Sequence, residues 1–132
     1  MIKTIDVEVS GQGLYDISAS VTAAIEIEEG LCTLFIRHTS ASLLIQENYD
    51  PTAKLDLERW LYKLVPEDDP DYTHLIEGPD DMPAHIKSAL TATSLSIPVK
   101  ARSLMLGTWQ GIFLWEHRHT ARVRQIILHM DE

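Results

Sequence analysis

The run Ile112-Phe113-Leu114-Trp115 places four large apolar side chains at consecutive positions. Successive side chains of a β-strand point to opposite faces of the sheet, so this strand is apolar on both faces. A strand of this kind must be covered on both sides. One chain of this length with short helices can barely supply that cover, and a second subunit is the simplest source of the rest. The segment therefore predicts a homo-oligomer.

The elements around this strand do not alternate as they would in a series of βαβ units. The pattern predicts strands over 2–9, 31–37, 41–46, 95–99, 104–106 running on through 112–117, and 123–129, and helices over about 17–25, over 51–64 and from about 81. The first helix is expected to have three turns and to stop at Gly30. The core-facing residues of the other two are expected to be Ala53, Leu57, Trp60, Leu61 and Leu64, then Ile86, Ala89 and Leu90. The predicted class is α+β, with about three helices and a large mixed, mostly antiparallel sheet.

Length and composition indicate one ordinary globular domain over residues 1–132, since 45% of the residues are hydrophobic and 23% are charged. The net charge of -9 argues against nucleic acid or an anionic membrane as the partner. Basic residues gather late: residues 1–84 hold 17 acids and 5 bases, and residues 85–132 hold 3 acids and 6 bases. With a single Cys32, no signal-peptide core and no apolar run of about 20 residues, we expect a cytoplasmic protein.

The segment 72–87 holds the densest group of chemically active side chains. His74, Asp80, Asp81, His85 and Lys87 all lie within it. His85 is expected in the first turn of the third helix, where the helix dipole favours the neutral imidazole. Only the neutral ring can bind a metal or accept a proton. That helix end and Lys87 could instead receive a phosphate. The alternative is structural: Asp80 and Asp81 cap the helix and the histidines only form hydrogen bonds, since their spacing fits no tight metal motif.

The segment 107–119 holds a second group. In a strand, Glu116 and Arg118 lie side by side, and if they are buried they must neutralise each other or a ligand. They could equally be solvated beyond the strand end. His117 and His119 are spaced as two ligands on one face could be, although solvated histidines of a hairpin are the simpler interpretation.

A third group is His38-Thr39-Ser40 together with residues 46–50. His38 continues the face of Cys32, Leu34 and Ile36, so its ring should emerge at the end of a buried surface, as a functional or a structural histidine. The sequence contains no GxSxG elbow, phosphate-binding loop, GxGxxG or CxxC pair, which argues against the common hydrolase and nucleotide-binding folds.

These motifs together resemble the YjbQ family of small bacterial and archaeal proteins. The resemblance rests on HTSA at 38–41, EN-x-D at 47–50, EGPDDMPAHIKS at 77–88, S-x-x-IPV at 94–99, GTWQG at 107–111 and E-x-R at 116–118. It covers almost the whole chain. It implies a homotrimer with a site near the subunit boundary, and a weak thiamine-phosphate synthase activity that joins a pyrimidine diphosphate to a thiazole phosphate.

The resemblance also implies the members of the site. The candidate catalytic residues are His38, Asp50, Asp81, Gln110 and Glu116, the candidate phosphate-binding residues are Thr39, Asn48, Lys87 and Arg118, the candidate metal ligands are His38, His74 and His85, and Asp80 belongs to the same site. A divalent metal is expected, with zinc favoured over magnesium. The competing hypothesis is a trimer that binds a phosphorylated metabolite without turnover. Arg102 stands where the family usually has glycine, so we expect its hairpin turn to be rebuilt.

Overall fold

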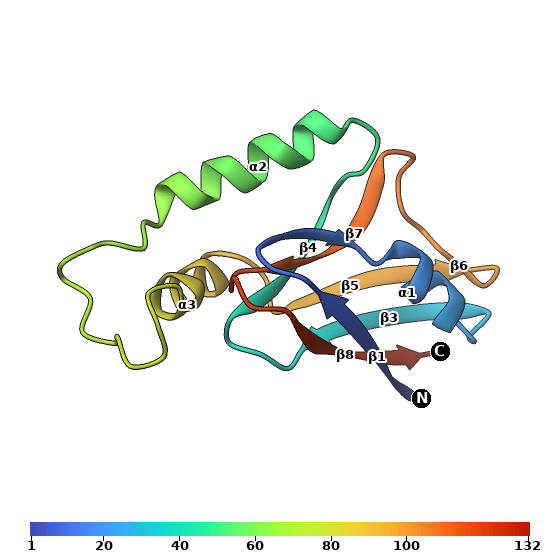
Figure 1. The fold of residues 1–132 in the computed structure, drawn as a ribbon. Coiled ribbons are helices and arrows are strands. Elements are labelled where there is room, and N and C mark those ends of the chain that lie inside the picture. Colours follow the sequence, from blue (N-terminus) through green and yellow to red (C-terminus); the bar gives the residue numbers. More distant parts are fainter.

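The computed structural model describes residues 1–132 as two antiparallel sheets and three helices (Figure 1). The strands are β1 (Ile2–Val9), β2 (Gly13–Asp16), β3 (Glu29–Ile36), β4 (Ala41–Glu47), β5 (Ser94–Lys100), β6 (Ser103–Leu104), β7 (Gln110–Glu116) and β8 (Arg122–Asp131). The helices are α1 (Ser18–Ala24), α2 (Pro51–Leu64) and α3 (Asp81–Leu90). The α+β class and the three helices are confirmed. No helix is long and apolar enough to cross a membrane.

The sheets stack as layers. One sheet has the strand order β1-β8-β3-β5-β6 and the other β2-β7-β4, and every strand pair in both is antiparallel. The expected mixed sheet is thus two wholly antiparallel ones. The larger apolar core lies between the sheets, and a smaller one lies between the three-stranded sheet and α2. Figure 1 shows α2 along one side of that sheet, with α1 and α3 at opposite ends of the molecule.

Strand β7 is buried on both faces, as its sequence predicted. Ile112 and Leu114 face the larger core, and Phe113 and Trp115 face the smaller core under α2. The second sheet and α2 of the same chain supply this cover. The cover of β7 therefore requires no partner subunit, because a chain that splits its strands into two sheets covers a central strand from within. The homo-oligomer itself stays a prediction.

Three elements differ from the sequence prediction. Residues 13–16 form the unpredicted edge strand β2, and α1 has only 7 residues and ends at Ala24. Gly30 is therefore part of β3 rather than a helix stop. Segment 104–117 is not one strand, since β6 belongs to the five-stranded sheet and β7 to the other. The apolar residues on either side of these glycines predicted longer helices and strands. In the structure the chain passes from one sheet to the other in segment 104–117, so the predicted strand is divided.

Helix α2 has the predicted bounds and the predicted cap. The Thr52 amide donates to Asp50 Oδ1 at 2.9 Å, and Pro51 follows at the first helical position. Only Leu61 of its expected core stripe is buried, whereas Trp60 is 63% exposed and Leu64 is 52% exposed. In α3, likewise, Ala89 and Leu90 are exposed. The helical spacing of the apolar residues was predicted correctly. Only part of the apolar face of each helix packs against the rest of the protein, and the remainder is exposed.

The β5–β6 hairpin keeps a left-handed turn without glycine. Ala101 and Arg102 have φ values of 52° and 60°, and Lys100 pairs with Ser103 across them. Two residues with positive φ make the turn type that normally uses Asn-Gly. The expectation that Arg102 rebuilds the turn was wrong. The exposed Arg102–Glu28 ion pair offsets little of the strain.

Replacing Arg102 with glycine should therefore stabilise the protein. A side chain at positive φ costs about 1 kcal/mol that glycine does not incur, and the gain is reduced by the greater freedom of glycine in the unfolded chain. We expect Arg102→Gly to raise the free energy of unfolding by about 0.5 kcal/mol in urea titrations. Ser103→Gly, a change in the adjoining strand, is the matched control and should lower it. If the Arg102→Gly protein were less stable than the wild type, the claim that Arg102 is strained would be contradicted.

Candidate functional site

A buried ion pair at the end of β7 organises one end of the molecule. Glu116 is 1% exposed, and its two carboxylate oxygens accept from Arg124 Nε at 2.6 Å and Nη2 at 2.5 Å. Glu116 Oε2 also accepts the backbone amides of His117 and Arg118 at 3.1 and 3.0 Å. Arg124 Nη2 donates in addition to Ser40 Oγ at 2.8 Å. Glu116 is therefore neutralised by Arg124 and not by the predicted Arg118, and its catalytic role stays a prediction.

Arg118 instead holds the start of α3. Its Nε donates to Asp80 Oδ2 at 3.1 Å, its Nη1 to Asp81 Oδ1 at 2.6 Å and its Nη2 to the Glu77 carbonyl at 2.9 Å. Asp80 Oδ2 also accepts the His119 amide at 2.8 Å. Each side-chain nitrogen of Arg118 is thus used within the protein, and two carboxylates occupy the helix N-terminus. An anion is disfavoured at this helix end.

Three side chains converge beside this arginine. Asp81 Oδ2 lies 2.7 Å from His74 Nε2 and 3.0 Å from His85 Nε2, and the three potential ligand atoms lie within 4.8 Å of one another. We call His74, Asp81 and His85 the histidine–aspartate triad. The carboxylate is buried, while both imidazoles are partly exposed to solvent. Asp81 and His85 are one helical turn apart on α3, which places them on the same face.

The contacts of His85 call for a positive charge between its ring and Asp81, as a proton or as a bound cation. His85 Nδ1 lies 3.1 Å from the Thr39 carbonyl oxygen, which can only accept, so Nδ1 carries a proton. A neutral imidazole then has a bare Nε2, which would face the bare Asp81 Oδ2 at 3.0 Å. Either an additional proton or a bound cation must lie between these two atoms. A backbone carbonyl that fixes the far nitrogen is the usual arrangement of a metal-binding histidine.

The electrostatics of the two carboxylates favour their charged forms. Burial alone would raise the pKa of Asp80, but hydrogen bonds from the His119 amide and Arg118 outweigh it and hold the pKa below its usual range. Burial also acts to raise the pKa of Asp81. The hydrogen bond from His74 and the charges of His85 and Arg118 lower it further than burial raises it. Asp81 is therefore a carboxylate, the form that a metal binds.

His117 is buried, contrary to the simpler interpretation of a solvated hairpin histidine. It is 1% exposed, and its Nε2 lies 2.9 Å from Ser42 Oγ. Burial, together with the charges of Lys87 and Arg124, lowers the pKa of His117 to about 3. His119 does lie at the surface, where it pairs with Glu67. The two histidines therefore do not act as a ligand pair.

His38 does not join the triad, in which Asp81 lies beside His74 and His85, and its role as a metal ligand stays a prediction. The Gln125 amide donates to His38 Nε2 at 2.9 Å, which occupies one of its two ring nitrogens. Burial and the Arg124 charge lower the pKa of His38. Its ring, with Thr39, lines an open groove of about 610 Å³ beside the triad. A catalytic role for His38 stays a prediction.

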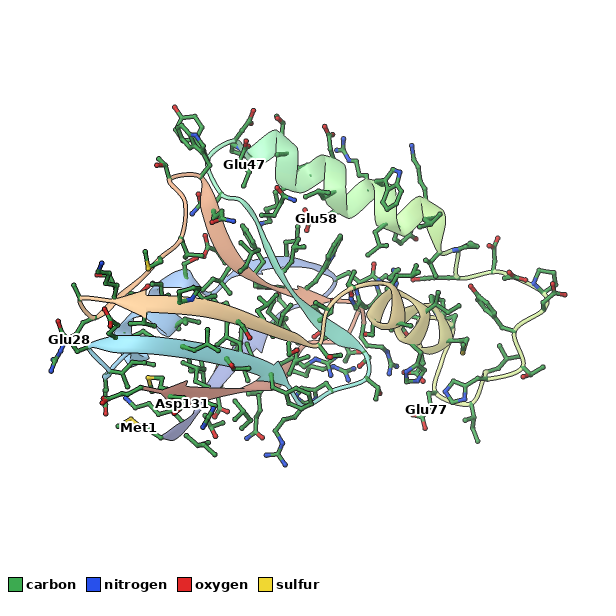
Figure 2. All side chains as sticks on the ribbon, turned by 180° about the vertical axis from the view of Figure 1, so that it is seen from behind. Met1, Glu28, Glu47, Glu58, Glu77 and Asp131 are labelled. Atoms are coloured by element: carbon green, nitrogen blue, oxygen red, sulfur yellow. The ribbon has the colours of Figure 1, made fainter.

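Asn48, Asp50 and Gln110 lie at the other end of the three-stranded sheet. In the β4–β7 register Glu47 pairs with Gln110, whereas Ala41 pairs with Glu116. Six residues of extended strand separate these ends, which is about 20 Å. Figure 2 shows Glu47, next to Asn48, and Glu77, in the loop before α3, on opposite sides of the molecule. The side chain of Asp50 caps α2 and that of Gln110 accepts the Gly107 amide, so within one chain the expected site is divided.

Lys87 lies on another side of α3 from the triad. Two residues beyond His85, it is rotated by about 200° around the helix axis. It is 3% exposed and lines a cavity of about 270 Å³ between α2 and the end of β7, to which neither triad histidine contributes. The predicted site thus contains two separate centres at this end of the molecule, the triad and the Lys87 cavity.

Arg124 and Ser42 were not anticipated from the sequence, and Ser40 was named there without a role of its own. Arg124 had a detectable signal, since it continues the buried face of Ile126, Leu128 and Met130 at strand spacing, where a charge requires a buried partner. The two serines had none, because they act through tertiary contacts.

Comparison with known proteins agrees with the fold. The family model described as "UPF0047 protein YjbQ-like" matches residues 3–132. A UPF0047 protein of Synechocystis (sll1880) is 51% identical over 124 residues, which cover 92% of this chain and 84% of that protein. The YjbQ protein of Salmonella typhimurium is 45% identical over 129 residues, covering 95% and 93%. The crystal structure of the conserved hypothetical protein TT1486 from Thermus thermophilus has a TM-score of 0.90 at 35% identity, covering 98% of this chain and 99% of that one.

Protonation of His117 should make stability depend on pH. Its pKa is about 3 in the folded protein and about 6.5 when unfolded, so the stabilisation it gives is complete above about pH 6.5 and is lost as the pH falls toward 3. We expect the free energy of unfolding to decrease by up to about 1.4 kcal/mol per pH unit through this group. His117→Gln, measured by urea titration from pH 4 to 7, should show a slope shallower by about one proton. Equal slopes in both proteins would contradict the buried neutral ring.

Proposed function

Because this chain belongs to the YjbQ-like UPF0047 family, we propose that it is a cytoplasmic, homotrimeric, metal-dependent transferase that acts on small phosphorylated molecules. The reaction we propose is a weak thiamine-phosphate synthase activity, the coupling of a pyrimidine diphosphate to a thiazole phosphate. The observation that carries the proposal is the convergence of His74, Asp81 and His85 on one point.

The donor set of the triad suits zinc. Two imidazole nitrogens and one carboxylate oxygen are the ligands of many catalytic zinc sites, which leave a further position open. Magnesium prefers oxygen ligands and retained waters, and therefore suits this set less well. The partial exposure of both imidazoles leaves room for a further ligand from solvent. A bound divalent ion would supply positive charge to the oxygens of a leaving diphosphate.

The residues of the chain itself would orient the two substrates and neutralise the charge of the leaving group. In the proposed coupling the bond from the pyrimidine methylene carbon to the diphosphate oxygen breaks, pyrophosphate departs, and the thiazole nitrogen forms a bond to that carbon. Proximity supplies much of such a rate. Arg118 and Asp80 act as positioning residues, because they hold the Asp81 carboxylate and the start of α3 in place.

Assembly would join the divided parts of the site. Asn48, Asp50 and Gln110 lie about 20 Å along the sheet from the Glu116 end, so only a neighbouring subunit would bring such residues to the triad. Exposed apolar side chains on α2, including Trp60 and Leu64, are candidate contacts for that assembly.

Metal content tests the ligand set. We expect zinc to bind near one equivalent per chain, and His74→Ala and His85→Ala each to lose most of it, because each removes one of three ligands. His38→Ala is the matched control and should keep the wild-type content, since the His38 ring is bonded to the Gln125 amide. Elemental analysis after dialysis against zinc gives the measurement. Wild-type content in both His74→Ala and His85→Ala would refute the triad as a metal site.

Turnover tests the reaction. Purified protein should form thiamine phosphate slowly from the two substrates, and His85→Ala should lower the rate at least tenfold, or about 1.4 kcal/mol of transition-state stabilisation. His129→Ala, at an exposed strand position, should leave the rate unchanged. Light scattering should give all three proteins a mass near three times 14.9 kDa.

The second candidate is a trimer that sequesters a phosphorylated metabolite. It is favoured by the internal engagement of Arg118 and Glu116, which leaves few free charged groups around the triad. Saturable binding of the phosphorylated substrates without any product would select it over the transferase. Product formed equally by wild type and His85→Ala would place the activity elsewhere.

A further inference from the structure

Lys87 is a buried charge without a counter-ion. Its residue is 3% exposed, and none of the ion pairs in the structure involves Lys87. Its ammonium nitrogen lies over the Tyr62 ring, 5.3 Å from the ring centroid, and borders the cavity. Burial lowers the pKa of Lys87. A lysine held in this way costs stability that an anion in the cavity would recover.

The carboxylates that act on Lys87 are already engaged. Glu67 and Asp80 exert their charge on Lys87 from a distance. Glu67 Oε1 accepts from His119 Nε2 at 2.5 Å, and Asp80 Oδ2 accepts from Arg118 and from the His119 amide. Neither carboxylate is free to move to Lys87 without breaking these bonds.

The walls of the cavity combine aromatic surface with basic charge. Trp115 and Tyr62 line it, and Arg59 and Lys63 bring two further positive charges from α2. The carboxylates on its wall are those of Glu58 and Glu116, and Arg124 neutralises Glu116. Glu58 Oε2 is turned to the Leu14 amide at 2.9 Å. The cavity is therefore electropositive around Lys87, and the aromatic rings of Trp115 and Tyr62 form its wall beside that residue.

We propose that this cavity binds a small aromatic oxyanion, with the oxyanion on Lys87 Nζ and the ring against Trp115 and Tyr62. Its volume of about 270 Å³ is just below the range of pockets for drug-sized ligands, and it suits one ring carrying a phosphate or a carboxylate. This site is additional to the triad of the proposed function and does not require a metal. It gives the predicted phosphate role of Lys87 a location of its own.

Phenyl phosphate is the probe, with benzoate and the neutral benzyl alcohol beside it. Equilibrium dialysis in the presence of a chelator measures binding to the full-length protein. Phenyl phosphate should bind saturably and benzyl alcohol at least tenfold more weakly, and the affinity of benzoate relative to phenyl phosphate tells whether the site selects phosphate or accepts any oxyanion. In a Trp60→Phe, Trp109→Phe background, Trp115 is the only tryptophan, and its emission should change with the same binding curve.

Substitutions assign the site. Lys87→Met keeps the apolar stem, removes only the charge, and should weaken phenyl phosphate binding at least tenfold. Lys63→Met makes the same charge change at an exposed position on the rim of the cavity and should weaken binding less than threefold. His85→Ala should leave binding unchanged.

The opposite results would overturn the proposal. These are no saturable binding to the wild type at millimolar concentrations, equal losses in Lys87→Met and Lys63→Met, or loss of binding in His85→Ala, which would move the ligand to the triad. If the triad binds no metal but phenyl phosphate still binds through Lys87, the transferase proposal fails and this one stands.

Discussion

The Glu116–Arg124 ion pair is the constraint on which this end of the molecule depends. Two buried charges cost several kcal/mol each to desolvate, and they persist because they neutralise each other through two hydrogen bonds and Arg124 Nη2 also donates to Ser40. The pair joins the ends of β7 and β8 to the β3–β4 connection at Ser40. Through the Glu116 carboxylate it also fixes the backbone amides of residues 117 and 118, and so directs Arg118 toward α3.

Charge then alternates outward from that pair. Arg124 neutralises Glu116, Arg118 neutralises Asp80 and Asp81, and Asp81 faces the two histidines. Each buried charge meets an opposite one, apart from the imidazole edge of the triad and Lys87. These two exceptions lie on different sides of α3, where a cation and an anion respectively would complete the alternation. We therefore propose that α3, at one end of the molecule, separates a cation site from an anion site.

Several features followed from local sequence alone. Asp50-Pro51 defined the start of α2, the alternation of Cys32, Leu34 and Ile36 defined the buried face of β3, and four consecutive apolar residues marked β7 as a strand covered on both sides. The sequence also placed His74, Asp81 and His85 in one short segment, although it predicted His38 rather than Asp81 as the third metal ligand. These features can be predicted from local sequence because each depends on a helix cap, on the alternation of side chains along a strand, or on the spacing of a few nearby residues.

Only the tertiary structure decided which charge meets which and what covers each face. Glu116 and Arg118 are adjacent on a strand face, yet Glu116 pairs with Arg124 and Arg118 with Asp80 and Asp81, across distances in sequence that no local pattern encodes. The cover of β7 came from the division of the strands into two sheets, which places α2 on one face and the second sheet on the other. The sequence determined the two-sided burial of β7, and the packing of layers determined that one chain could satisfy it.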